Sequence, residues 1–136
     1  MLNEELGTMM TIIIADDSPD FRERVRNMVL THKNIQIVGE PENGLDVLKQ
    51  VNEKEPDMII LDIRMPHMDG IQVLKRLKAQ GSKTIICMLT SYPYPQYKKK
   101  CLALGADFFF NKSDGFGKIN QAIANVSKDI QLASRV

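Results

Sequence analysis

The sequence has few cysteines, no excess of charge of either sign and no long apolar run. Its two cysteines, Cys87 and Cys101, show no C-x-x-C or metal-ligand spacing, which is typical of an intracellular chain with reduced thiols. Lysine and arginine total 18 against 17 for aspartate and glutamate, so charge gives no reason to expect nucleic acid as a direct partner. No run approaches the roughly 18 apolar residues of a membrane span, and the N-terminus lacks a signal-peptide pattern. We therefore expect a cytoplasmic protein that binds neither membrane nor DNA directly.

Five short apolar runs alternate with helical patterns along the chain. The runs are TIII at 11–14, IQIV at 35–38, MIIL at 58–61, TIICML at 84–89 and DFFF at 107–110. Most are continuously apolar, as in parallel strands covered on both faces, whereas the second alternates with polar residues, which indicates an edge strand. A chain of 136 residues is one domain by length. We expect residues 1–10 to form a short N-terminal lead and residues 11–133 to form a doubly wound α/β sandwich with parallel strand order 2-1-3-4-5.

The predicted helices have recognisable starts and stops. The first is expected to start after Asp17 or Ser18, the second after Asn43, the third near Asp69 and the fourth at about Pro95, and the third and fourth end at Gly81 and Gly105. The short polar side chains suit N-caps, and the glycines suit left-handed C-terminal caps. In the second helix we expect Leu45, Leu48 and Val51 to point into the core.

Polar residues stand at the carboxyl ends of four of the five predicted strands. Asp16 and Asp17 follow the first, Asp62 the third, Thr90 ends the fourth, and Lys112 comes just after the fifth. Ligands of such sheets bind at these strand ends, beside the point where strand order reverses. Three carboxylates within ~4 Å repel by several kcal/mol at an effective dielectric near 20, so they require protonation or a cation. With no histidine or cysteine among the ligands, Mg²⁺ fits best, with Mn²⁺ as the alternative.

Asp62 ends an apolar strand, where a carboxylate without a partner is unfavourable. A single aspartate at a strand end is usually a cap or turn residue. That reading leaves unexplained why Asp16, Asp17, Thr90 and Lys112 gather at the same edge. A carboxylate beside a divalent cation, an ammonium and a hydroxyl has what a phosphoryl-transfer nucleophile requires, since the cations offset charge on the transferring oxygens. We therefore predict that Asp62 forms an aspartyl phosphate.

Four motifs carry a resemblance to a known family. They are ADDS at 15–18, LDIRMPHMDG at 61–70, LTS at 89–91 and GADFFFNKS at 105–113. In this order and spacing the chain resembles, over roughly residues 10–130, the receiver domain of response regulators in two-component signalling, in the manner of a single-domain chemotaxis regulator. The resemblance implies a flavodoxin-like fold and a phosphorelay role.

The resemblance also implies a role for each site residue. Asp62 matches the phosphoacceptor, which takes its phosphoryl group from a histidine kinase, and Asp16 and Asp17 match the acidic pair that holds Mg²⁺. The backbone carbonyl of Arg64 is the expected further metal ligand, beside Asp62 itself. Thr90 matches the hydroxyl that moves to the phosphoryl group.

The same comparison assigns four further positions. Lys112 matches the lysine that pairs with the phosphoryl group, and Phe109 the switch aromatic that turns inward. Arg64 and Tyr92 match positions that tune the lifetime of the acyl phosphate. The chain departs from the family at Ser113, where most receivers have proline, and at Phe109, which lacks the hydroxyl of the commoner tyrosine.

The function expected is a phosphorylation-driven switch and not an enzyme, because the chain would catalyse only its own phosphotransfer and autodephosphorylation. Expected partners are a sensor histidine kinase or phosphotransfer protein, an unknown output protein and a second copy of the phosphorylated chain. Output would use the face formed by the helix from about Pro95 to Gly105, the last strand and the last helix. The alternatives are the receiver of a larger DNA-binding regulator and an Asp-nucleophile phosphohydrolase. The second is disfavoured because Arg64 stands where that class of enzyme has a second aspartate.

Overall fold

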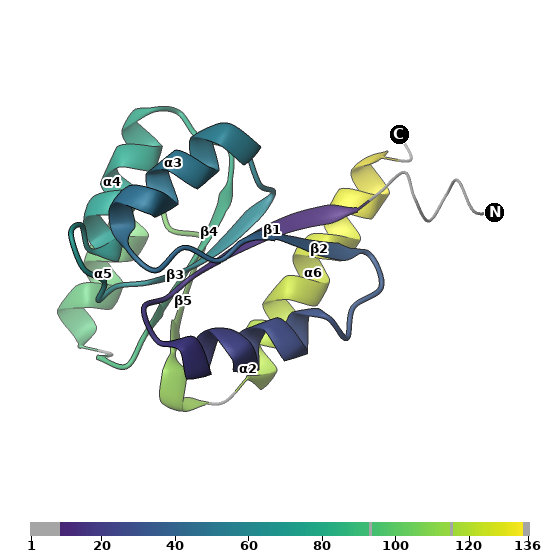
Figure 1. Ribbon diagram of the computed structural model, residues 1–136, viewed down its shortest axis with the longest axis horizontal. Helices are drawn as coiled ribbons and strands as arrows, with labels where there is room; N and C mark the ends of the chain where they lie inside the picture. Colours follow the sequence, from purple (N-terminus) through teal and green to yellow (C-terminus); the bar gives the residue numbers. More distant parts are fainter. Residues whose placement is uncertain (1–8, 93, 115, 135–136) are drawn as a thin grey trace.

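A computed structural model describes residues 9–92, 94–114 and 116–134 of the chain. A single five-stranded parallel sheet runs through its centre, with helices on both faces (Figure 1). The strands are β1 (Met10–Ala15), β2 (Ile35–Gly39), β3 (Met58–Asp62), β4 (Ile85–Thr90) and β5 (Phe108–Asn111). The helices are α2 (Pro19–Val29), α3 (Gly44–Lys54), α4 (Gly70–Ala79), α5 (Pro95–Ala103) and α6 (Gly117–Ser134), with a short 3-10 helix, η1, at Lys112–Asp114.

The strand order is β2-β1-β3-β4-β5, and every neighbouring pair is parallel. This confirms the doubly wound, flavodoxin-like fold and places β2 at an edge, as its alternating pattern predicted. The predicted lead, residues 1–10, lies mostly outside the described residues. Within the described residues, no helix has the length and apolar character needed to cross a membrane.

Two apolar cores lie on opposite faces of the sheet. Alternate strand residues divide between them: Ile13 and Leu61 face α3, α4 and α5, whereas Ile12 and Ile60 face α2 and α6. All four side chains are almost fully buried, at 0 to 2% exposure. Burial of such a side chain contributes about 1.5 to 3 kcal/mol, so covering both faces of the strands explains their continuous apolar sequence.

Side-chain caps fix where the helices begin. Ser18, and not Asp17, caps α2: its hydroxyl accepts a hydrogen bond from the N–H of Phe21 at 3.3 Å. Asn43 caps α3 in the same way, and Asp69 forms a reciprocal capping box with Gln72 at the start of α4. These caps place the first turns of α2 and α4 next to the carboxyl ends of β1 and β3. They therefore position the loops that carry the candidate site.

The prediction that Leu45 points into the core is wrong. Leu45 is 53% exposed, whereas Val47 and Val51 are buried and Leu48 is half-buried against the core. Each residue turns a helix by about 100°, so Val47, Leu48 and Val51 share one side of α3 and Leu45 lies about 100° away from it. The inward face of α3 is thus set by the two valines.

Candidate functional site

Two neighbouring strands bring the acidic residues together. β1 pairs with β3, with Ala15 opposite Leu61, so Asp16 and Asp62 emerge side by side at the carboxyl edge of the sheet. Carboxylate oxygens of Asp16, Asp17 and Asp62 all lie within 4.8 Å of one another. Asp16 and Asp62 are buried, at 2% and 5% exposure, whereas Asp17 is exposed. The cluster is therefore anchored in the core and open to solvent on one side.

Lys112 lies over this cluster. Its Nζ is 2.6 Å from Asp16 Oδ2 and 3.4 Å from Asp62 Oδ2. The same nitrogen lies 4.2 Å from the centre of the Phe21 ring, which supports it from below by a cation–π contact. One ammonium group is thus shared by two buried carboxylates, with Asp16 as the closer partner.

The Asp62 carboxyl group has a strongly shifted pKa. The pKa of Asp62 is raised to about 7: burial is the largest cause, the negative charge of Asp16 adds to the rise, and Lys112 and the N–H of Arg64 oppose it. A single lysine therefore does not balance the cluster. A divalent cation would supply the missing positive charge, and three carboxylates without histidine or cysteine are a donor set that fits Mg²⁺.

Gly70 holds the loop after β3 against Asp62. A Cβ atom at Gly70 would lie 2.1 Å from the backbone oxygen of Asp62, closer than any side chain allows. The Gly70 N–H also donates a 2.7 Å hydrogen bond to the backbone oxygen of Ile63. The first turn of α4 therefore rests directly on the end of β3, and only glycine fits there.

Thr90 ends β4, the strand next to β3, and Phe109 lies on β5. Thr90 is fully buried, and its hydroxyl oxygen accepts a 2.9 Å hydrogen bond from the Tyr92 N–H. A hydroxyl that accepts in this way can still donate its own proton. Phe109 is half-buried and packs against the core beneath α3, α4 and α5 together with Tyr97 and Leu104.

Arg64 and Tyr92 meet above the acidic cluster. The guanidinium carbon of Arg64 lies 4.2 Å from the centre of the exposed Tyr92 ring. The two side chains line a pocket of about 460 Å³ whose other walls include Asp17, Ser18, Asp62 and Lys112. The pocket thus leads from solvent to the Asp62 carboxylate.

Ser113 keeps a hydrogen bond that proline cannot make. Its N–H donates to Asn111 Oδ1 at 3.0 Å, within the turn that carries Lys112. No peptide bond among the described residues is cis. In this chain the Asn111 side chain therefore stabilises the turn after β5.

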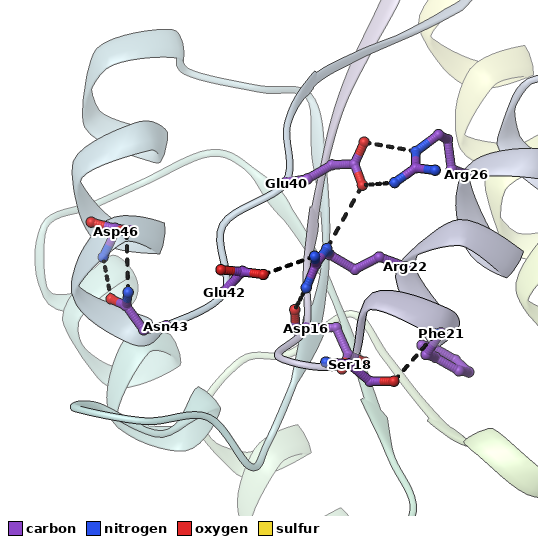
Figure 2. Close-up of polar contacts among 9 residues, drawn as sticks. All are labelled: Asp16, Ser18, Phe21, Arg22, Arg26, Glu40, Glu42, Asn43 and Asp46. Carbon is purple, nitrogen blue, oxygen red and sulfur yellow. Dashed lines mark hydrogen bonds and ion pairs between the residues drawn. The ribbon is translucent and has the colours of Figure 1, made fainter.

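A charged network that the sequence did not predict lies next to the site. Arg22 of α2 points toward the end of β1 and donates a 2.6 Å hydrogen bond to the backbone oxygen of Asp16 (Figure 2). Its guanidinium also pairs with Glu42 at 2.9 Å and with Glu40 at 3.8 Å. Arg26 binds Glu40 through two hydrogen bonds of 2.9 and 2.7 Å. The only sequence signal was two arginines one helical turn apart and two glutamates after the second strand.

Comparison with known proteins agrees with the fold and the motifs. The family model for the response regulator receiver domain matches residues 12–124. The transcription regulator BvgA of Bordetella pertussis is 33% identical over 111 residues, which are 82% of this chain and 53% of that protein. The transcriptional regulatory protein YhcZ of Bacillus subtilis is 39% identical over 97 residues, 71% of this chain and 45% of that protein. The chain thus spans about half the length of these relatives.

Solved structures give the same picture. The signal receiver domain of the response regulator NarL from Mycobacterium tuberculosis is similar with a TM-score of 0.82 and 28% identity, covering 88% of this chain and 97% of that one. The response regulator domain of Thermotoga maritima CheB, at 24% identity and a TM-score of 0.74, shares the fold.

Proposed function

The chain belongs to the response regulator receiver domain family, and from this premise we propose that residues 11–133 form a phosphorylation-driven switch with Asp62 as phosphoacceptor. The donor would be the phosphohistidine of a sensor histidine kinase or of a phosphotransfer protein. One observation carries the proposal: the Asp62 carboxylate lies at the base of a pocket, within 4.8 Å of the Asp16 and Asp17 carboxylates, and Lys112 is 3.4 Å away.

The proposed reaction is a single displacement at phosphorus. A carboxylate oxygen of Asp62 attacks the phosphorus atom, a P–O bond forms, and the P–N bond of phosphohistidine breaks with its electron pair returning to the imidazole. When bound, Mg²⁺ would offset the negative charge on the transferring phosphoryl oxygens. Asp16, Asp17, Asp62 and the backbone carbonyl of Arg64 would hold it.

Two side chains would then bind the phosphoryl group on Asp62. Lys112 already reaches both buried carboxylates, so its ammonium can pair with a phosphoryl oxygen. The Thr90 hydroxyl, which accepts the 2.9 Å hydrogen bond from the Tyr92 N–H, can donate its own proton to another phosphoryl oxygen. Movement of Thr90 would draw the half-buried Phe109 ring inward, which alters the surface of α5, β5 and α6. The altered surface would then bind a partner protein or a second copy of the chain.

Arg64 and Tyr92 would control how long the acyl phosphate persists. Hydrolysis requires a water molecule to reach the phosphorus atom through the pocket above Asp62. The stacked pair at 4.2 Å lines that pocket. The chain would thus catalyse only its own phosphorylation and dephosphorylation. We place the protein in the cytoplasm, where its two buried, free cysteines would stay reduced.

A second candidate is the receiver part of a larger DNA-binding regulator. Two observations favour it. Both relatives compared above are transcription regulators, and this chain covers only 53% of the length of one and 45% of the other. In that case the same switch would act on an attached effector domain. The length of the full reading frame separates the two candidates.

Phosphorylation itself is tested with acetyl phosphate. The protein is incubated with the reagent with and without Mg²⁺ or Mn²⁺, and intact mass is measured. We expect a mass increase of one phosphoryl group only with the metal, and none for Asp62→Asn. Modification of Asp62→Asn, or of wild type in excess EDTA, would contradict the proposal. Size-exclusion chromatography of the beryllofluoride complex reports whether a dimer forms.

A further inference from the structure

Arg22 touches the backbone of the acidic cluster and none of its carboxylates. Its side chain is 11% exposed, and its Nη1 donates to the backbone oxygen of Asp16 at 2.6 Å (Figure 2). On the other side of the same residue, the Asp16 N–H donates to the backbone oxygen of Pro41 at 3.3 Å. The Asp16 backbone is therefore held from two directions, by α2 and by the segment after β2.

The peptide bond that Arg22 holds leads directly into Asp17. Because a peptide unit is planar, fixing the Asp16 carbonyl oxygen also fixes the direction in which Asp17 leaves the strand. Among the described residues, the exposed Asp17 carboxylate makes no hydrogen bond or ion pair. Asp16, by contrast, accepts from the Ser18 N–H at 2.9 Å and pairs with Lys112. The backbone is thus what directs the Asp17 carboxylate toward the cluster.

The guanidinium group is itself held in place. Glu42 lies 2.9 Å from Nη2 of Arg22, and Glu40 lies 3.8 Å from its Nε. Arg26 binds Glu40 by two hydrogen bonds, and among the described residues it makes no hydrogen bond or ion pair with Asp16. A guanidinium has donors pointing in several fixed directions, so it can serve a carbonyl and two carboxylates together. A lysine ammonium cannot match that geometry.

We propose that Arg22 is a positioning residue for the Mg²⁺ site: it orients the Asp16–Asp17 peptide and so aims the Asp17 carboxylate at the ion. The inference rests on the proposed metal-dependent function. Mg²⁺ demands near-ideal octahedral geometry at short distances, so a small change in the direction of one ligand weakens binding.

A simple charge effect would act in the opposite direction. Arg22 is a cation close to a site for a cation, so removing its charge without disturbing Asp17 would strengthen Mg²⁺ binding. A positioning role for Arg22 predicts weaker Mg²⁺ binding for Arg22→Gln and also for Arg22→Lys, which keeps the charge. The sign of the change separates the two explanations.

The test is a Mg²⁺ titration followed by backbone amide chemical shifts in NMR. The variants are Arg22→Lys and Arg22→Gln, with Arg26→Gln as the matched control from the same network. For both Arg22 variants we expect the dissociation constant to rise about tenfold, as for loss of other groups that orient metal ligands. Arg26→Gln is expected to stay within twofold of wild type. Thermal unfolding without metal measures how much stability each variant loses.

The outcomes are distinguishable. Arg22→Lys within twofold of wild type, tighter binding by Arg22→Gln, or equal weakening by Arg26→Gln would each overturn the positioning role. If Arg22→Gln does not fold, Arg22→Lys decides, and Glu42→Gln, which releases one partner of the guanidinium, is a milder variant expected to weaken binding by two- to threefold. Absence of Mg²⁺ binding by the wild type would instead refute the proposed function.

Discussion

Arg64 and Tyr92 form a cation–π pair, with the guanidinium carbon 4.2 Å from the ring centre, across the mouth of the pocket above Asp62. They stand two residues after Asp62 and two after Thr90, in the loops that follow the neighbouring strands β3 and β4. The two side chains contact each other and line the same pocket, so we expect a change in one to alter the position of the other. We therefore expect the pair to act as one unit.

We predict that Arg64→Ala and Tyr92→Ala each change the rate of dephosphorylation by more than twofold, and that the double variant changes it little further. Loss of one partner frees the other, so the effects of contacting residues do not add. The rate is measured as loss of phosphorylated protein after removal of acetyl phosphate. Rates within twofold of wild type for both single variants would contradict the prediction.

The raised pKa of Asp62 predicts an unusual dependence of stability on pH. In the unfolded chain the pKa of an aspartate is about 3.9, whereas in the metal-free folded protein that of Asp62 is about 7. Between these values the folded state binds more protons, so the contribution of Asp62 to stability is fully present below about pH 4 and is lost as the pH rises to about 7.

The Asp62→Asn variant has no carboxyl group at this position, so it does not lose this contribution to stability as the pH rises. In EDTA, we predict that the variant exceeds the wild type in free energy of unfolding by on the order of 2 kcal/mol at about pH 8, with a smaller difference at about pH 5. Urea unfolding at the two pH values measures it. A difference independent of pH would show that Asp62 does not titrate in this range.

Asp17→Asn separates metal binding from folding. Because the Asp17 carboxylate is exposed and unpaired among the described residues, we predict that the substitution leaves metal-free stability within about 0.5 kcal/mol of wild type. At free Mg²⁺ tenfold above its dissociation constant, the wild type should gain about 1.4 kcal/mol. The variant should gain almost none.

Thermal unfolding with and without Mg²⁺ measures both quantities. An equal gain in stability for the variant and the wild type would place the Mg²⁺ effect elsewhere on the protein.

Gly70→Ala should damage both the fold and the site. The added Cβ would lie 2.1 Å from the backbone oxygen of Asp62, so α4 must move away from β3. We predict a loss of about 2 to 4 kcal/mol in the free energy of unfolding and slower phosphorylation by acetyl phosphate. Gly117→Ala, where a Cβ has no neighbour within 4 Å, is the matched control and should change neither quantity.

The sequence by itself determined the elements, their order and the composition of the acidic cluster. Continuous apolar runs predict strands buried on both faces, and Asn43 and Asp69 predict helix starts, because both signals are local. Asp16 and Asp62 could be paired in advance because carboxyl ends of adjacent parallel strands must meet at one edge. The roles proposed for Thr90, Lys112 and Phe109 stay predictions.

Only the tertiary structure decided which side chains support that cluster. The contact of Arg22 with the Asp16 backbone depends on the angle at which α2 leaves β1, and its pairing with Glu42 depends on where the segment after β2 passes. The Phe21 ring beneath Lys112 joins residues 91 positions apart. Leu45 faces solvent because packing of α3 favoured Val47 and Val51. Such contacts follow from the packing of whole elements, which no local pattern of residues encodes.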